Sequence, residues 1–131
     1  MKNTDSNPPR SEKNSPKDIV IRTFNFAVTV IQLCVKLDER PGVGRVLQIL
    51  RAGTSVPANV EEAQAAQSKT DFVSKMSIAL KEARETHLRL RLLVPANVVP
   101  TTDLSSLIQE ADEIKRIIGA IIVSTKRGGT D

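Results

Sequence analysis

The 131-residue sequence predicts an all-α protein, a single antiparallel up-down-up-down bundle of four helices. Apolar residues recur at steps of three and four along four segments, which is the period of one helix face. Short connectors rich in proline, glycine, serine or threonine separate these segments. No segment alternates with period two for long enough to predict a strand. The bundle is placed at residues 16–125, between a disordered polar tail at 1–15 and a flexible end at 126–131.

The first helix is predicted to begin at Pro16 and to run to about Leu37. Ser15 is a candidate N-cap, and Asp18 completes a capping box with it. The apolar residues of this segment form two stripes. One contains Val20, Phe24, Ala27, Ile31 and Cys34, and the other contains Phe26, Val30, Leu33 and Leu37. One stripe is enough for an internal core, so the second indicates a buried contact with another subunit.

The second helix is predicted from about Val43 to about Gln67, with Pro57 in its middle. The helical period passes through the proline along a single seam, which favours one kinked helix over two separate ones. That seam is Val46, Leu50, Gly53, Pro57 and Val60. Three roles for the proline stay open: a kink that wraps the helix around the bundle, a ligand-binding notch, and a subunit contact.

The surroundings of the proline lead to two expectations. Its ring presses on the carbonyl group of Gly53, where the absence of a side chain lets a neighbouring helix approach closely. The carbonyl oxygen of Gly53 loses its helical donor, so we expect Thr54, Ser55 or Asn59 to donate a hydrogen bond to it.

The third helix is predicted to open at a capping signature, Ser68 to Asp71, and to run to about Val94. Its core face is Phe72, Met76, Ala79, Ala83 and Leu90. Pro95 and Pro100 are expected to close the connector on both sides. The fourth helix follows over residues 103–124. Its core face is Leu104, Leu107, Ala111, Ile114, Ile118 and Ile121.

Composition limits the function classes. The formal net charge is +4, and residues 69–100 carry six basic and three acidic side chains, so an anionic partner is permitted. The N-terminus has no signal-peptide core, and the most apolar run, residues 26–35, is too short to span a bilayer. We therefore expect a soluble cytoplasmic protein with no membrane partner and no identified small-molecule substrate. Cys34 is expected to be an inert buried thiol, and His87 has no companions for a metal site.

Two groups of side chains are candidate sites. The first is a structural or interface polar cluster on the second helix: Arg51, Ser55, Pro57, Asn59 and Glu62. Nothing near this cluster resembles a nucleophile with its base, so catalysis there is disfavoured. The second is one flank of the third helix, with Lys81, Arg84 and Arg91, which contains no acid and could follow a phosphate backbone. A solvated basic face with no ligand is the alternative. The other flank is expected to pair with itself, as Asp71–Lys75 and Glu85–Arg89.

The stretch from Leu50 to Ala63, LRAGTSVPANVEEA, resembles the signature of the four helix bundle protein family, also called the 23S ribosomal RNA intervening-sequence protein family. The third helix extends the resemblance. The matching positions are Arg51, Ser55, Val56, Asn59, Val60, Glu62, Asp71, Phe72, Ile78, Ala79, Lys81, Glu82, Ala83, Glu85, Thr86, Leu90, Leu92 and Leu93. Ala63 departs from the usual glycine, and Leu88 with Arg89 departs from a frequent aromatic pair.

The resemblance implies an antiparallel four-helix bundle that assembles as a ring-shaped homopentamer and has no known activity. One relative in the family is a basic accessory protein that binds nucleic acid and its reverse transcriptase. We therefore expect a non-enzymatic homo-oligomer, without catalytic, cofactor or metal site, whose partner is RNA, DNA or a nucleic-acid enzyme. With three Phe and neither Tyr nor Trp, binding should be electrostatic and poor in sequence preference. The alternative is a protein–protein adaptor that binds no nucleic acid.

Overall fold

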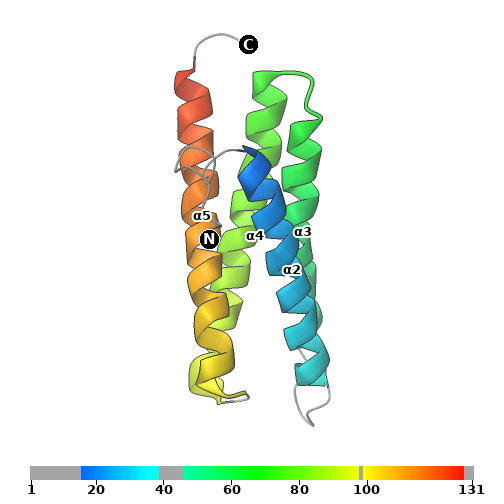
Figure 1. Ribbon diagram of the computed structural model, residues 1–131, viewed down its shortest axis with the longest axis vertical. Helices are drawn as coiled ribbons and strands as arrows, with labels where there is room; N and C mark the ends of the chain where they lie inside the picture. Colours follow the sequence, from blue (N-terminus) through cyan, green and yellow to red (C-terminus); the bar gives the residue numbers. More distant parts are fainter. Residues whose placement is uncertain (1–15, 39–45, 98, 129–131) are drawn as a thin grey trace, which may run out of the picture.

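A computed structural model describes residues 16–38, 46–97 and 99–128. These ranges contain four helices and no strand: α2 (Pro16–Asp38), α3 (Val46–Gln64), α4 (Lys69–Ala96) and α5 (Thr101–Arg127). The helices lie side by side along one long axis, and successive helices alternate in direction (Figure 1). The predicted all-α class is confirmed.

The bundle has one core, which all four helices line. Each helix packs against the next one in the chain, and α2 also packs against α5, so α2 lies diagonally opposite α4. One predicted stripe of α2 lies inside this core: Phe26, Val30, Leu33 and Leu37 are buried. The predicted second stripe of α2 is split. Ala27 and Cys34 are buried with the core, whereas Phe24 and Ile31 are 55% and 42% exposed.

The helix ends differ from the prediction in three of the helices. α3 ends at Gln64, three residues early, and α5 runs from Thr101 to Arg127, past both predicted ends. The expectation that Pro95 closes the third helix is wrong, because α4 continues through Pro95 to Ala96. A proline one residue from the end removes a single helical hydrogen bond, which is a small loss there. Asn97 ends the helix instead, with a left-handed backbone at φ 58°.

One predicted cap is confirmed, and the other lies outside the described residues. Ser68 Oγ accepts a hydrogen bond of 3.0 Å from the backbone N–H of Asp71, so the capping signature starts α4 where the sequence predicts. The proposed cap at Ser15 is among the residues that the structure does not describe.

Helix α3 is continuous through Pro57, as predicted, and Gly53 has a packing role. A Cβ atom at Gly53 would lie 2.8 Å from Cγ1 of Val30, so the glycine allows α2 to approach α3 closely. The other expectation at this place is wrong, because Thr54, Ser55 and Asn59 do not bond the carbonyl of Gly53. Their side chains donate to the carbonyl oxygens of Leu50, Arg51 and Ser55. The kink itself stays a prediction.

Candidate nucleic-acid interface

The predicted basic flank lies on the solvent face of α4. Lys81, Arg84 and Arg91 are all exposed, and within the described ranges none of them forms an ion pair. The buried line of α4, which includes Ala83 and Leu90, lies on the opposite side of the helix. The three basic heads therefore remain hydrated and free to meet an anion.

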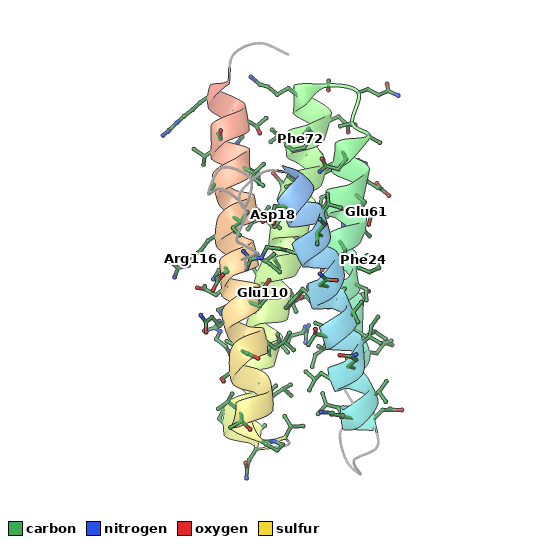
Figure 2. All side chains as sticks on the ribbon, viewed as in Figure 1. Asp18, Phe24, Glu61, Phe72, Glu110 and Arg116 are labelled. Atoms are coloured by element: carbon green, nitrogen blue, oxygen red, sulfur yellow. The ribbon has the colours of Figure 1, made fainter. Side chains whose placement is uncertain are left out.

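Helix α5, which packs against α4, carries two further basic residues, Lys115 and Arg116. Burial first, and then the positive charges of Lys115 and Arg91, lower the pKa of His87 on α4. Arg116 is 77% exposed and projects away from the bundle (Figure 2). The sequence analysis missed this contribution because residues on separate helices meet only through tertiary packing. We call Lys81, Arg84, Arg91, Lys115 and Arg116 the basic face.

Asp112 pairs with both basic residues that α5 contributes to the basic face. Asp112 Oδ1 lies 3.3 Å from Lys115 Nζ, and Oδ2 lies 2.9 Å from Arg116 Nε. The hydrogen bond with Lys115, followed by the charge of Arg116, lowers the pKa of Asp112, so the carboxylate stays ionised. The face as a whole retains an excess of positive charge.

The opposite flank of α4 is neutralised by ion pairs, within the helix and with α3. Arg51 of α3 bonds Glu82 at 3.2 Å and also bonds Glu85, while Arg89 Nε lies 2.9 Å from Glu85 Oε2. Hydrogen bonds from Arg89 and then Arg51 lower the pKa of Glu85. The predicted Glu85–Arg89 pair is confirmed.

The other predicted pair on this flank is wrong. Lys75 Nζ lies 3.6 Å from Glu62 Oε1 on α3, and no ion pair joins it to Asp71 within the described residues. The neighbouring helix brings Glu62 within reach of the lysine. The pair joins α3 to α4, as the bonds of Arg51 do.

In the polar cluster of α3, side chains donate hydrogen bonds to backbone carbonyl oxygens one turn earlier in the same helix. Ser55 Oγ donates to the carbonyl oxygen of Arg51 at 2.6 Å, and Asn59 Nδ2 donates to that of Ser55 at 2.8 Å. Pro57 is buried, Ser55 and Asn59 are half-buried, and Glu62 is exposed. The connection to the rest of the bundle comes from Arg51 and Glu62, which pair with α4. The cluster thus fixes α3 against α4, and any role at a subunit contact stays a prediction.

A second ion-pair group, which sequence reasoning did not find, joins α2 to α5. Arg22 Nη2 lies 2.6 Å from Glu110 Oε1 and 3.0 Å from Glu113 Oε1, with a third bond from Nε to Glu110. The bond to Glu110 is the largest cause of a raised pKa at Arg22. An arginine between apolar residues, in the run Ile19 to Phe24 of α2, was the available signal. This group stabilises the α2–α5 contact.

The isolated cysteine and histidine offer no reactive centre. Cys34 is buried, and burial raises the pKa of its thiol, which disfavours the thiolate. Across the part of the chain that the structure describes, no three His, Cys, Asp or Glu side chains come together as metal ligands. The residues that could carry chemistry are therefore the charged surfaces described above.

Helix α2 is also the one helix, within the described ranges, that is long and apolar enough to cross a membrane. The segment Asp18–Asp38 has a mean hydropathy of 1.5, so the whole helix passes this test by length and composition, whereas the run at 26–35, to which the expectation referred, is too short by itself. Its side chains Val30, Leu33 and Leu37 are core residues of the bundle, which gives the apolar sequence a structural reason.

Four antiparallel helices around one core, with a basic face shared by α4 and α5, define a class of small helical-bundle proteins. The chain belongs to the 23S rRNA-intervening sequence protein family, which matches residues 17–120. It is also similar to a solved protein of unknown function from the S23 ribosomal protein family of Bacteroides thetaiotaomicron. The two are 35% identical over 82% of this chain and 97% of that one, with a TM-score of 0.78. No curated protein matches the chain. The family resemblance is confirmed, and neither comparison brings an enzyme activity with it.

Proposed function

We propose that this chain is a non-enzymatic accessory module that assembles as a homo-oligomer, a pentamer as the family resemblance implies, and binds RNA or DNA by charge. The observation that carries the proposal is the basic face: Lys81, Arg84 and Arg91 of α4 are exposed and form no ion pair within the described residues, and α5, which packs against α4, adds Lys115 and Arg116. On the other flank of α4, Glu82 and Glu85 neutralise Arg51 and Arg89. The excess positive charge of α4 is therefore confined to the flank with Lys81, Arg84 and Arg91. A nucleic-acid enzyme bound to the same polymer is a compatible partner.

Oligomerisation strengthens weak charge-driven binding. A formal charge of +4 on one chain becomes about +20 on five chains, and several basic faces can then contact one polymer. The chain has no tyrosine or tryptophan on which to stack bases, so the affinity should depend on salt far more than on sequence.

The non-enzymatic part rests on the bonding of the polar residues. Ser55 and Asn59 already donate to backbone carbonyl oxygens, and Cys34 is buried. No activated nucleophile lies beside a base among these groups. Turnover that disappears when Asn59 or Glu62 is substituted would contradict this part. A cytoplasmic location belongs to the same proposal, and the single cysteine suits it.

The test is a salt titration of binding to a fluorescein-labelled 20-nucleotide RNA, followed by fluorescence anisotropy between about 50 and 300 mM salt. The variant combines Lys81→Gln, Arg84→Gln and Arg91→Gln. Each phosphate group that the variant no longer neutralises should lower the slope of log K against log salt by about 0.7. Three such phosphates lower it by about 2 for every chain that touches the RNA.

The control variant removes three positive charges elsewhere, with Lys36→Gln, Lys75→Gln and Arg89→Gln. It should retain most of the slope. Equal loss in both variants would show that net charge alone attracts the RNA and that the basic face is no site. Absence of binding by the wild type at 50 mM salt would contradict the proposal.

A second candidate function is a protein–protein adaptor, which a different observation favours. Helix α2 exposes several large apolar side chains, including Phe24 and Val35. A surface of this kind binds protein better than it binds a polyanion. Binding to one protein partner that persists above about 300 mM salt, together with no RNA binding, would support this alternative.

A further inference from the structure

The single histidine of the chain lies in line with two arginines of the basic face. His87 follows Arg84 by three residues and precedes Arg91 by four, so the three side chains project from one side of α4. The two arginines are two helical turns apart, about 10.5 Å along the axis. Of the two residues that bridge this gap, Leu88 is apolar, and His87 alone can carry a charge.

Helix α5 contributes charges of both signs to the surroundings of His87, which is half-buried. Burial, then the positive charge of Lys115 and then that of Arg91 lower the pKa of His87, and the negative charge of Asp112 opposes them. Asp112 is also bound to Lys115 at 3.3 Å and to Arg116 at 2.9 Å, so its charge is shared among three cationic groups. The cationic form of the imidazole is therefore disfavoured in the free protein.

Helix α3 packs against the other side of α4 and adds no charge to these surroundings. Arg51 and Glu62 form their ion pairs with the opposite flank of α4, and Glu61 is exposed. Helix α2 does not pack against α4. Among the described residues, the charges that act on His87 thus come from α4 and α5.

A polyanion on the basic face would reverse this balance. Its phosphate groups oppose the positive charges of Arg91 and Lys115, and they attract a cationic imidazole directly. A group whose charged form is stabilised by a ligand holds its proton more tightly when that ligand is bound. Histidine is suited to this change, because its ordinary pKa of about 6.5 lies close to neutral pH.

We propose that His87 is a further phosphate-binding residue of the basic face, which takes up a proton from solvent when RNA or DNA binds and then donates a hydrogen bond to a phosphate oxygen. This inference rests on the proposed nucleic-acid binding and adds a dependence on pH to it. The bound state holds more protons than the free state, so the affinity increases as the pH falls. No bond of the nucleic acid breaks.

The composition assigns such a dependence to one side chain. The chain has one histidine, and its single cysteine is buried with a raised pKa. His87 is therefore the one side chain whose ordinary pKa lies between about 5 and 8. The α-amino group, ordinarily at about 7.7–8.0, is the nearest other group that titrates, and a variant without the histidine distinguishes the two.

The test measures binding of a rhodamine-labelled RNA by fluorescence anisotropy at constant ionic strength. A unit charge about 4 Å from a phosphate oxygen in water strengthens binding about five-fold, so between about pH 8 and pH 5.5 the wild type should gain up to that factor for every chain that touches the RNA. His87→Gln should lack this gain. His87→Lys, which is charged throughout this range, should bind at pH 8 at least as tightly as the wild type at pH 5.5.

Two further measurements separate a charged contact from a structural role of His87. The wild-type slope of log K against log salt should be steeper at about pH 5.5 than at about pH 8, by about 0.7 for every chain in contact, because one more phosphate is neutralised. The slope of His87→Gln should be the same at both pH values. In proton–carbon NMR spectra of isotopically labelled wild type, the ring signal of the one histidine should titrate at a higher pH with RNA than without it.

The matched control moves the histidine to another helix. His87→Gln combined with Gln32→His places it at an exposed position of α2, which lies diagonally opposite α4. Exposed charges more than a Debye length apart, about 10 Å, are screened from one another, so the affinity of this control should change by less than about two-fold over the same pH range.

The outcomes separate this inference from the proposed nucleic-acid binding. Wild-type binding that depends on salt but not on pH, or an equal pH dependence in His87→Gln, would overturn the inference and leave the proposed function intact. His87→Lys that binds at pH 8 no more tightly than His87→Gln would overturn it too, and this comparison needs no acidic buffer. Absence of RNA binding at every pH would overturn both.

Discussion

Gly53 allows α2 and α3 to pack closely, and substitution to alanine measures how much that close packing matters. The new Cβ would lie 2.8 Å from Cγ1 and 3.2 Å from Cβ of Val30, a fully buried residue. Valine has one strongly preferred rotamer in a helix, so its methyl groups cannot turn away freely. Overpacking of this kind costs about 1–3 kcal/mol. The better helix propensity of alanine offsets about 1 kcal/mol of that cost.

Gly53→Ala should therefore lower the free energy of unfolding by about 0–2 kcal/mol, whereas an exposed helical glycine would gain about 1 kcal/mol. Val30→Ala alone should cost about 2–3 kcal/mol, because it removes buried methyl groups and leaves a cavity. In the Val30→Ala background the clash with Cγ1 is gone and only the 3.2 Å contact with Cβ remains, so Gly53→Ala should stabilise by up to about 1 kcal/mol. The double-mutant cycle should give a coupling of about 1–3 kcal/mol.

The assay is urea unfolding followed by circular dichroism at one protein concentration, because an oligomer's stability depends on concentration. Additive effects, with a coupling below about 0.5 kcal/mol, would refute the close-approach argument. A single Gly53→Ala variant that is stabilised by about 1 kcal/mol would refute it as well.

Three further predictions concern ion pairs and caps. Arg22→Met removes the bonds to Glu110 and should lower the free energy of urea unfolding by about 1–2 kcal/mol, since the pair is half-buried. Ser68→Ala should cost about 1 kcal/mol in the same assay, through loss of the α4 cap. Bonds from Arg89 lower the pKa of Glu85, so its contribution to stability is complete above about pH 4.3 and declines as the pH falls through the lower folded value. Glu85→Gln should therefore weaken the protein at pH 7 and flatten its loss of stability below about pH 4.3, measured as the denaturation midpoint against pH.

Each of these variants has a matched control at an exposed site. Arg127→Met, Ser74→Ala and Glu61→Gln change the same residue types away from the ion pairs and caps described above, and each should alter stability by less than about 0.5 kcal/mol. A control that loses as much stability as its partner variant contradicts the corresponding bond as the cause. An unchanged acid limb in Glu85→Gln would mean that other carboxylates set the pH dependence.

The fold could be predicted from local rules because the apolar residues within each helix mark the face that packs in the core. Steps of three and four along the chain identified the four helices, and the capping signature at Ser68 placed the start of α4. The close approach at Gly53 was predictable as well, because the residue lies on the apolar seam of its helix, one turn before Pro57, and has no side chain to keep a neighbouring helix away. Pro95 misled the prediction, because a proline in the last turn removes too few hydrogen bonds to end a helix.

The site was less predictable, because it depends on which residues meet across helices. Spacing alone paired Asp71 with Lys75, whereas the neighbouring helix supplies Glu62 at 3.6 Å. Lys115 and Arg116 come near α4 only because α5 packs against it, and no pattern within one helix contains that information. Periodicity also showed that α2 has more apolar residues than one core needs, and the structure was required to show which of them stay outside.

The most direct test of the central claim is size-exclusion chromatography of the purified wild type with light scattering, recording absorbance at 260 nm in low and in high salt. The chain has no tyrosine or tryptophan, so bound nucleic acid would stand out against almost no protein signal. The account predicts a mass several times 14.3 kDa, about five-fold if the family resemblance holds, with nucleic acid that is retained in low salt and released in high salt. A single-chain mass, or an oligomer that captures no added RNA or DNA in low salt, would contradict it.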